Sequence, residues 1–361
     1  MHFKKIGLFV GLAAVSGAAF ATCDSTLSSY QSAVASNNLA LARQEISETP
    51  ECFGGSPASA QVQINGTSFQ QAAAISRSLR LRFESDNPGP RADAGIKGMA
   101  AGNAGKKWNV WGNVENNDTR QSYRNLGGLV TRNDSDVLNT VLGVDYSLSP
   151  TAVFGVSVAI DRGDTAGTDS TFTYLNKVDT DGYSIAPYVG IQINKALSFD
   201  ASLGMGKGKF GTNHRTDGKS DRWFGAANLN YEHWMGQVQF TGKASYLRAV
   251  EDYENTRNAG VPVIGTAARN TLGQIRLVAQ AGYWMNGVMP YASLGYVSDV
   301  ERKSTLFGAT NPIGKDAWVW SLGINFISLS NGLTGGIAYK QEESRGNQQN
   351  KSLMANIALR F

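Results

Sequence analysis

The chain has 361 residues, a formal net charge of +4, 41 glycines and 10% aromatic but only 17% charged residues. This composition argues against a disordered chain, and no basic stripe with interleaved aromatics supports nucleic-acid binding. After the N-terminal region, no stretch approaches the roughly 18 to 20 consecutive apolar residues of a membrane helix.

The N-terminus has the pattern of an export signal. Lys4 and Lys5 precede an apolar run, Ile6 to Ala14, and Ala19–Ala21 has the small-x-small form of a signal-peptidase site. We therefore expect residues 1–21 to be a signal peptide that is cleaved after its last residue.

Cys23 and Cys52 are the two cysteines of the chain. An exported protein meets oxidising conditions, so we expect a disulfide, and closing its loop of about 30 residues would contribute roughly 3 to 4 kcal/mol. Helix-like stretches at 25–35 and 39–46 predict a stapled helical hairpin within residues 22–55. A lipid anchor on Cys23 is the weaker alternative, because the residues beside it do not fit a lipidation signal.

Asn65–Gly66 indicates a turn, and Ser68 with Gln71 forms a plausible capping box, so the sequence predicts a helix over about 69–83. The Gly, Pro and Ala composition of residues 86–105 indicates a linker.

The predicted helix has a narrow apolar stripe, Ile75, Leu79 and Phe83, with arginines spread around the remainder. Such a helix suits a polar tube whose carboxylates can pair with the arginines. An ordinary surface helix is the alternative. The candidate lumenal helix charges are Arg77, Arg80 and Arg82.

Beyond residue 106 the sequence has a period of two. In the stretch 152–161, Phe154 and Val156 alternate with Gly155 and Ser157, so that one face is apolar and the other is polar or small. In a transmembrane barrel these faces meet lipid and lumen, which explains the mean hydropathy of -0.25. The pattern predicts twelve strands, near 106–116, 136–148, 151–162, 180–194, 196–209, 220–234, 237–250, 269–285, 287–299, 315–328, 332–342 and 350–361.

The connections between these strands alternate in length. Five are tight turns, at 149–150, 195, 235–236, 286–287 and around 331–332, and six are long and polar, at 117–135, 163–179, 210–219, 251–268, 300–314 and 343–349. Short periplasmic turns and long external loops are typical of outer-membrane barrels, and this count puts both barrel ends in the periplasm.

The last strand alternates to the final residue, which is aromatic, and a barrel needs such a strand to pair with its first strand. Aromatic residues also gather near the short turns, where a membrane interface is expected. A soluble sandwich is the weaker alternative, because it would not usually combine these features. The row that we expect to face lipid and to act as an assembly signal is Leu353, Ala355, Ile357, Leu359 and Phe361.

Six short motifs lie at residues 107–112, 142–146, 154–158, 181–190, 291–296 and 359–361. In this order and spacing they resemble the translocator β-domain of autotransporters, the type V secretion proteins. The resemblance covers roughly 290 residues, from the predicted helix to the C-terminus, and it implies a twelve-stranded barrel with a helix threaded through the lumen. It also implies outer-membrane lipid, the barrel assembly machinery and periplasmic chaperones as partners.

The chain departs from the family upstream of the barrel. Family members carry passengers of hundreds of residues, whereas only about 40 residues here separate the signal from the helix region, too few to build a core around a catalytic site. The expected fold is therefore all-β: a twelve-stranded antiparallel transmembrane β-barrel with an N-terminal helix in the lumen. The expected segments are a signal peptide (1–21), a disulfide-closed helical segment (22–55), the lumenal helix and linker (56–105) and the barrel (106–361).

Charged residues on the lumenal face are the candidate site. They could pair with the helix arginines or simply solvate the lumen, and the sequence does not separate these possibilities. The lumenal set is Glu115, Asp145, Asp161, Asp200, Lys243, Arg276, Lys340 and Arg360.

We predict no catalytic residue, cofactor or metal site. His214 and Asp217 form a weak pair on an expected external loop, and the glycines of 204–208 lie within a strand rather than in a phosphate loop.

The leading hypothesis is a non-enzymatic outer-membrane barrel, exported in a Gram-negative bacterium, that anchors or translocates a very short N-terminal segment. A porin-like or plugged barrel is the alternative, and a barrel-embedded hydrolase is less favoured. The sequence leaves open whether residues 22–85 are displayed, periplasmic or a plug. Early disulfide formation would favour retention of 22–52 in the periplasm, because two helices side by side span about 20 Å.

Overall fold

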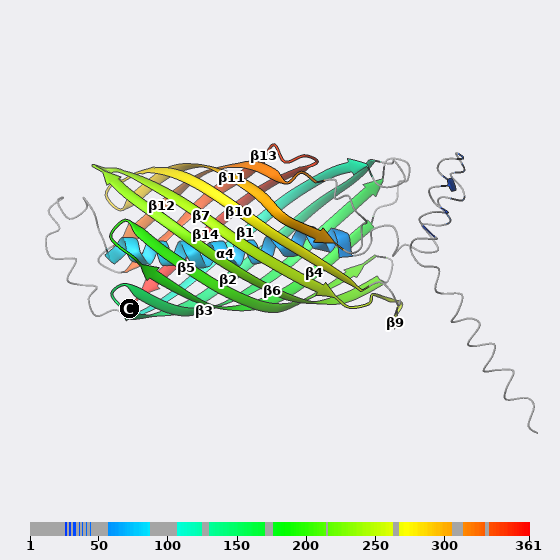
Figure 1. Ribbon diagram of the computed structural model, residues 1–361, viewed down its shortest axis with the longest axis horizontal. Coiled ribbons are helices and arrows are strands. Elements are labelled where there is room, and N and C mark those ends of the chain that lie inside the picture. The colour runs from blue at the N-terminus through cyan, green and yellow to red at the C-terminus, as the bar shows by residue number, and fades with distance from the viewer. Residues whose placement is uncertain are drawn as a thin grey trace, which may run out of the picture.

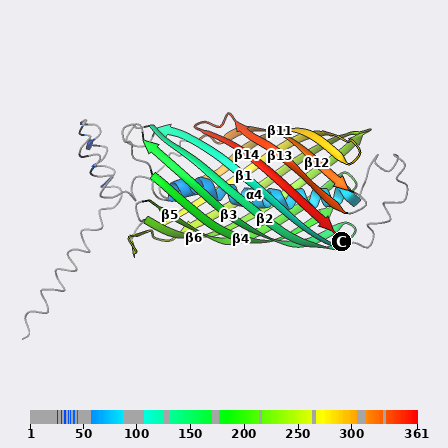
Figure 2. The ribbon, with the colours of Figure 1, turned by 180° about the vertical axis from the view of Figure 1, so that it is seen from behind.

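The computed structural model is a closed antiparallel β-barrel with a long helix, α4, inside it (Figures 1 and 2). The structure describes residues 57–86, 107–124, 130–169, 176–213, 216–262, 267–304, 313–328 and 332–361, together with isolated positions between 26 and 44. Among these described residues, no helix is long and apolar enough to cross a membrane.

Twelve long strands form the barrel wall, and a two-residue pair, β8 and β9, adjoins β6 beyond it. The bounds are α4 Pro57–Asp86, β1 Trp108–Arg124, β2 Val130–Ser149, β3 Ala152–Asp169, β4 Asn176–Gln192, β5 Leu197–Thr212, β6 Thr216–Met235, β7 Val238–Tyr253, β8 Arg257–Asn258, β9 Val261–Pro262, β10 Ala268–Tyr283, β11 Val288–Ser304, β12 Asp316–Ser328, β13 Leu333–Glu343 and β14 Gln348–Arg360.

The twelve-stranded barrel predicted from the sequence is confirmed. Each wall strand pairs with its neighbours along the chain, and β1 pairs with β14 over the register Asn109↔Arg360 to Gln121↔Gln348. At the end of this seam, Trp108 and Phe361 each donate a main-chain hydrogen bond to the other's carbonyl oxygen, both of 3.0 Å. The wall therefore has no unpaired edge along its length.

We call the end of the barrel with the short turns the turn rim and the opposite end the loop rim. The strands end within a few residues of their expected positions at the turn rim, where the β10–β11 turn has positive φ at both Asn286 (47°) and Gly287 (99°). Asn-Gly suits such a turn, because both residues tolerate that conformation.

At the loop rim the strands extend further than the sequence predicted. The regions 210–219 and 343–349, expected to be long loops, are hairpins connected by residues 213–215 and 344–347. Most residues of the extended ends are polar, apart from the buried Phe210, so these ends lack the apolar alternation that identifies a strand, yet they continue the backbone pairing of the wall.

Apolar and polar residues alternate along the strands, and the two sets face opposite sides of the wall. On β3, Phe154 and Val158 face outward with 49% and 44% exposure, whereas Ser157 and Asp161 are buried on the lumenal side. On β14, the four large side chains of the row Leu353, Ile357, Leu359 and Phe361 are 46 to 58% exposed on the outer face, and Ala355 is also exposed.

Helix α4 runs along the lumen and is longer than expected. It begins at Pro57, a residue well suited to a first helical turn, and ends at Asp86, shortly before Pro88. The turn expected at Asn65–Gly66 and the capping box at Ser68 are wrong, because the helix continues through both. Inside a barrel, unbroken intrahelical hydrogen bonds satisfy the backbone, and this outweighs local turn preference.

The orientation of α4 follows from its contacts and from its course in Figure 1. Arg82, near its C-terminal end, reaches the main-chain carbonyl oxygen of Lys107 at the turn rim. The other end of the helix, darker blue in Figure 1, lies toward the opposite rim, away from the C-terminus of the chain. Pro57 is thus at the loop-rim end of α4.

Residues 1–21, both cysteines and the expected linker lie outside the described residues. Between 26 and 44, Ser32 and Ala33 are helical, and the amide of Leu41 donates to the side-chain oxygen of Asn38 at 3.2 Å. The disulfide between Cys23 and Cys52 stays a prediction.

Candidate functional site

The apolar face of α4 packs against the inner wall. Ile75, Leu79 and Phe83 are 0%, 1% and 5% exposed, so the stripe predicted from the sequence is the packed face of the helix. Leu79 lies directly over Gly190 of β4, where an added Cβ would come within 2.9 Å of the leucine side chain. A side chain at position 190 would therefore push the helix away from the wall.

Polar side chains fix α4 at two further points. Gln71 donates to Ser157 at 3.1 Å and accepts from Ser184 at 2.6 Å, which ties the helix to β3 and β4. One turn later, Ser76 donates to Asp200 of β5 at 2.8 Å. The glutamine assigned to a capping box is therefore a contact to the wall.

Arg82 forms a buried ion pair between helix and wall. Its guanidinium contacts the carboxylate of Asp145 on β2, and both side chains are buried. The same carboxylate accepts hydrogen bonds from Asn109 at 3.0 Å and Tyr188 at 2.9 Å. Asp145 thus joins three strands to the end of the helix.

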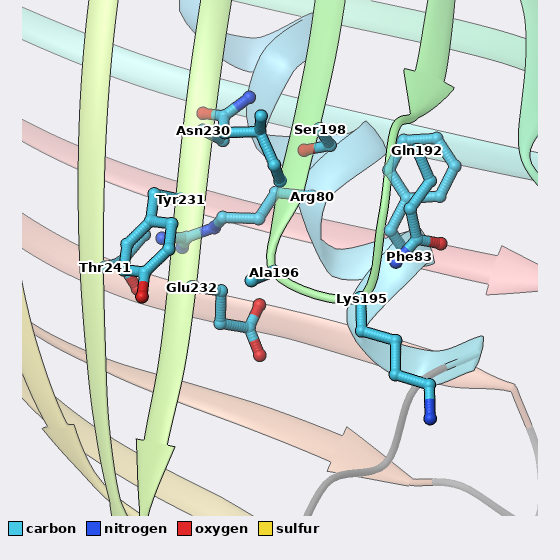
Figure 3. A pocket seen from close by; sticks show the side chains of 11 residues that line it. Arg80, Phe83, Gln192, Lys195, Ala196, Ser198, Asn230, Tyr231, Glu232 and Thr241 are labelled. Carbon is cyan, nitrogen blue, oxygen red and sulfur yellow. The ribbon is translucent and has the colours of Figure 1, made fainter.

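The other two helix arginines, Arg77 and Arg80, are less buried than Arg82 and contact other parts of the wall. Arg77 donates to the side-chain oxygen of Asn113 on β1 at 2.8 Å. Arg80 lines a pocket at the turn rim beside Asn230, Glu232 and Lys195 (Figure 3). Both side chains are partly exposed, so they meet the water-accessible part of the lumen.

The predicted lumenal charges point inward, but most of their partners are side chains of the wall rather than of the helix. Glu115 pairs with Lys340 at 2.7 Å. Asp161 pairs with Arg222 at 2.7 Å. Asp200 accepts from Asn228 at 2.7 Å and Asn230 at 3.0 Å in addition to Ser76. The remaining cations of the set are Lys243 and Arg276, which are partly exposed, and Arg360, which is buried next to the first strand.

A buried network around Arg222 was not identified from the sequence. Its guanidinium bridges Asp161 on β3 and Glu251 on β7, at 2.7 and 3.1 Å. To reach Asp161 it crosses β4 and β5 over Gly182 and Gly208, where an added Cβ would lie 2.3 and 2.5 Å from guanidinium nitrogens. These two glycines make room for the arginine.

A second network lies at the loop rim. Arg345, in the β13–β14 connection, donates to Asp299 at 2.8 Å and also contacts Glu342, and Arg302 contacts the same aspartate. Arg345 further donates to the carbonyl oxygen of Gly314 at 3.1 Å. The sequence placed the arginine in a long loop and gave no signal for its inward position.

The glycines of the β5 segment are explained by neighbouring strands rather than by the helix. An added Cβ at Gly204 would lie 2.0 Å from the ring of Phe224 on β6. Asp217 is exposed on β6, and His214 lies outside the described residues. Within the described part of the chain, no group of three or more metal-ligating side chains could hold a metal ion.

A closed wall with an apolar outer face and a polar lumen filled by a helix defines an outer-membrane type of β-barrel. The family model of the autotransporter β-domain matches residues 110–340, and the chain belongs to this family of type V secretion proteins. The protein is therefore a translocator-type barrel of the Gram-negative outer membrane. None of the curated proteins matches the chain.

Solved structures show the same fold. The translocator domain of the autotransporter NalP from Neisseria meningitidis is 13% identical, with a TM-score of 0.53 over 75% of this chain and 96% of that one. The β-domain of the Bordetella autotransporter BrkA is 15% identical, with 0.53 over 71% and 100%. The transport unit of AIDA-I from Escherichia coli is 12% identical, with 0.52 over 75% and 98%.

Proposed function

We propose that this barrel is a non-enzymatic outer-membrane anchor that displays a very short N-terminal segment, residues 22–56, at the cell surface. The direction of α4 carries the proposal. The helix ends at the turn rim and begins toward the loop rim, so Pro57 lies at the end of the barrel that we take as external (Figure 1). Outer-membrane lipid, the barrel assembly machinery and periplasmic chaperones are the partners that this function requires.

The contacts along the helix support this direction. Arg82 lies at the turn rim beside Lys107, whereas Gln71 reaches Ser157 and Ser184 in the middle of their strands. The 14 residues from Gln71 back to Pro57 add about 21 Å of helix toward the loop rim. The first residue of α4 therefore lies nearer to the loop rim than to the turn rim.

This orientation favours display over the periplasmic retention that an early disulfide would produce. A hairpin held in the periplasm would need a connection back through a lumen that α4 already occupies. We therefore expect the pairing of Cys23 with Cys52 to be compatible with an external position, formed after the segment has crossed or in a form narrow enough to cross.

Accessibility of an epitope tag on intact cells tests the proposal. A tag inserted after Thr22 should bind antibody without permeabilisation, as should a matched tag in the external region 263–266. A tag at Asn194, in the β4–β5 turn, should bind only after permeabilisation. If the Thr22 tag behaves like the Asn194 tag, the display function is wrong.

A plugged channel is the second candidate function, and one observation favours it. Three α4 side chains, Ala73, Arg77 and Arg80, are partly exposed although they lie within the barrel, so water reaches one face of the helix. Conductance after deletion of residues 22–86 separates a plug from a simple anchor.

A further inference from the structure

One face of α4 is in contact with water inside the barrel. Among the helix side chains that the structure describes, Ala73, Arg77 and Arg80 are partly exposed and the others are buried. Their spacing of i, i+4 and i+7 places them on a single stripe. The helix packs on β1 to β7 and β10, and this stripe is the part of its surface that the packing leaves open.

The wall around this stripe is polar and also partly exposed. Ser293 and Ser321 share a hydrogen bond of 2.5 Å on β11 and β12. Gln280 on β10 is partly exposed, as are Ser293 and Ser321, so a water-accessible space, which we call the passage, lies beside α4 on this side of the lumen.

The charges that face this passage have one sign. Two wall cations, Lys243 and Arg276, are partly exposed, as are Arg77 and Arg80 of the helix, whereas the charge of the partly exposed Lys340 is paired with Glu115. Lys243 of β7 pairs with Val278 of β10, two residues from Arg276, so these two cations lie on adjacent strands, and α4 packs on both of those strands. These cations therefore lie close enough together to act as a group.

The lumenal carboxylates do not offset this group in the water. Along the described wall between the rims they are buried, and each is held by protein partners, such as Asp200 by Ser76 and Glu115 by Lys340. A partly exposed exception, Glu232, lies at the turn-rim mouth, where Arg80 and Lys195 line the same pocket (Figure 3). The buried set is Glu115, Asp145, Asp161, Asp200, Glu251, Asp299 and Glu342.

We propose that the passage beside α4 binds and conducts small inorganic anions in preference to cations. Its fixed positive charges lie in a narrow aqueous space between low-dielectric walls. Such a space concentrates the field, which attracts anions and excludes cations. The buried carboxylates contribute less to the passage, because their charge is already compensated by direct hydrogen bonds and ion pairs.

Conductance of the full chain in a planar bilayer under a KCl gradient tests this proposal. The parent protein should give a zero-current potential with the sign of the chloride equilibrium potential, which means a chloride-to-potassium permeability ratio above one. Replacing two wall cations together, Lys243→Gln and Arg276→Gln, should move that potential toward zero.

A matched control replaces two cations on the outer surface. Lys207→Gln with Lys209→Gln removes the same charge from exposed residues that pair with Asp221 and Asp181, and selectivity should stay that of the parent. Folding of every variant is checked by heat-modifiable electrophoretic mobility. A folded parent barrel that passes no current, lacks selectivity or prefers potassium would overturn the proposal, as would equal shifts in the two double variants.

Discussion

Arg82 of α4 and Asp145 of β2 form a buried ion pair that connects the end of the lumenal helix to the barrel wall at the turn rim. The Asp145 carboxylate also accepts hydrogen bonds from Asn109 and Tyr188, so residues of the wall hold this carboxylate in place independently of Arg82. Arg82 is thus a helix arginine whose guanidinium is buried against a carboxylate of the wall, whereas Arg77 and Arg80 are partly exposed.

Replacing Arg82 with glutamine should destabilise the barrel. The change leaves a buried carboxylate without its ionic partner, and breaking a buried pair from one side costs about 3 to 5 kcal/mol. Unfolding in detergent, followed by the heat-modifiable shift in mobility, should show a lower midpoint for Arg82→Gln than for the parent.

Two further variants make this test specific. The double variant Arg82→Gln with Asp145→Asn should recover part of the loss, because it removes the unpaired charge while keeping a side chain that Asn109 and Tyr188 can contact. Arg77→Gln, which loses one hydrogen bond to Asn113 in the water-accessible passage, should cost only about 1 kcal/mol. Equal midpoints for Arg82→Gln and the parent would show that the pair does not hold the helix.

Gly182→Ala should weaken the Arg222 network although it replaces no charged residue. The new Cβ would lie 2.3 Å from the guanidinium, which cannot move without leaving Asp161 or Glu251. We expect a loss of free energy of unfolding of the order of 1 to 3 kcal/mol, as for overpacked cores. The measurement is the unfolding midpoint in detergent.

Gly211→Ala on the neighbouring strand β5 is the matched control. An added Cβ there meets no heavy atom within 4 Å, so its midpoint should stay close to that of the parent. If the two alanine variants behave alike, the arginine does not depend on the space above Gly182.

The sequence predicts the membrane-facing part of this protein well, for a physical reason. Lipid outside and a polar lumen inside impose alternation on residues such as Phe154 and Ser157, and that alternation is visible in one dimension. At the loop rim the outward residues of a strand are polar as well, so the stretch Thr216 to Lys219 has no apolar alternation and resembles a loop. The strands were therefore expected to be shorter than they are.

Partners across the lumen are harder to predict than the direction of a side chain. Asp161 was expected to face inward, and it does, but its partner Arg222 lies three strands away along the wall. That contact depends on the curvature of the barrel and on the glycines beneath the guanidinium. The length of α4 was likewise underestimated, because Asn65–Gly66 indicates a turn when the surrounding barrel is not considered.

Phe361→Asp should block assembly of the barrel. The side chain is 57% exposed at the end of the outer row, and its backbone closes the seam through Trp108. A carboxylate near the membrane interface costs at most about 1 kcal/mol, so a complete loss would reflect recognition of the C-terminal residue rather than stability. The measurement is the amount of heat-modifiable barrel in outer-membrane fractions.

Tyr283→Asp controls for a new charge at the same rim. Tyr283 is 47% exposed near the β10–β11 turn and is not part of the terminal strand. This variant should assemble. Normal assembly of Phe361→Asp would refute the signal, and failure of both variants would assign the defect to the added charge.

Two nested deletions should show which part of the N-terminal region closes the lumen. Removing residues 22–56 leaves α4 with its contacts to Ser157, Asp200 and Asp145, so conductance should remain close to that of the parent. Removing residues 22–86 also takes out the helix, and a twelve-stranded barrel without it has room for a continuous water-filled path. The second deletion should therefore give a large rise in conductance in planar bilayers.

A comparable rise from the first deletion would place the plug in the short N-terminal segment. No rise from the second deletion would mean that side chains of the wall close the lumen without α4.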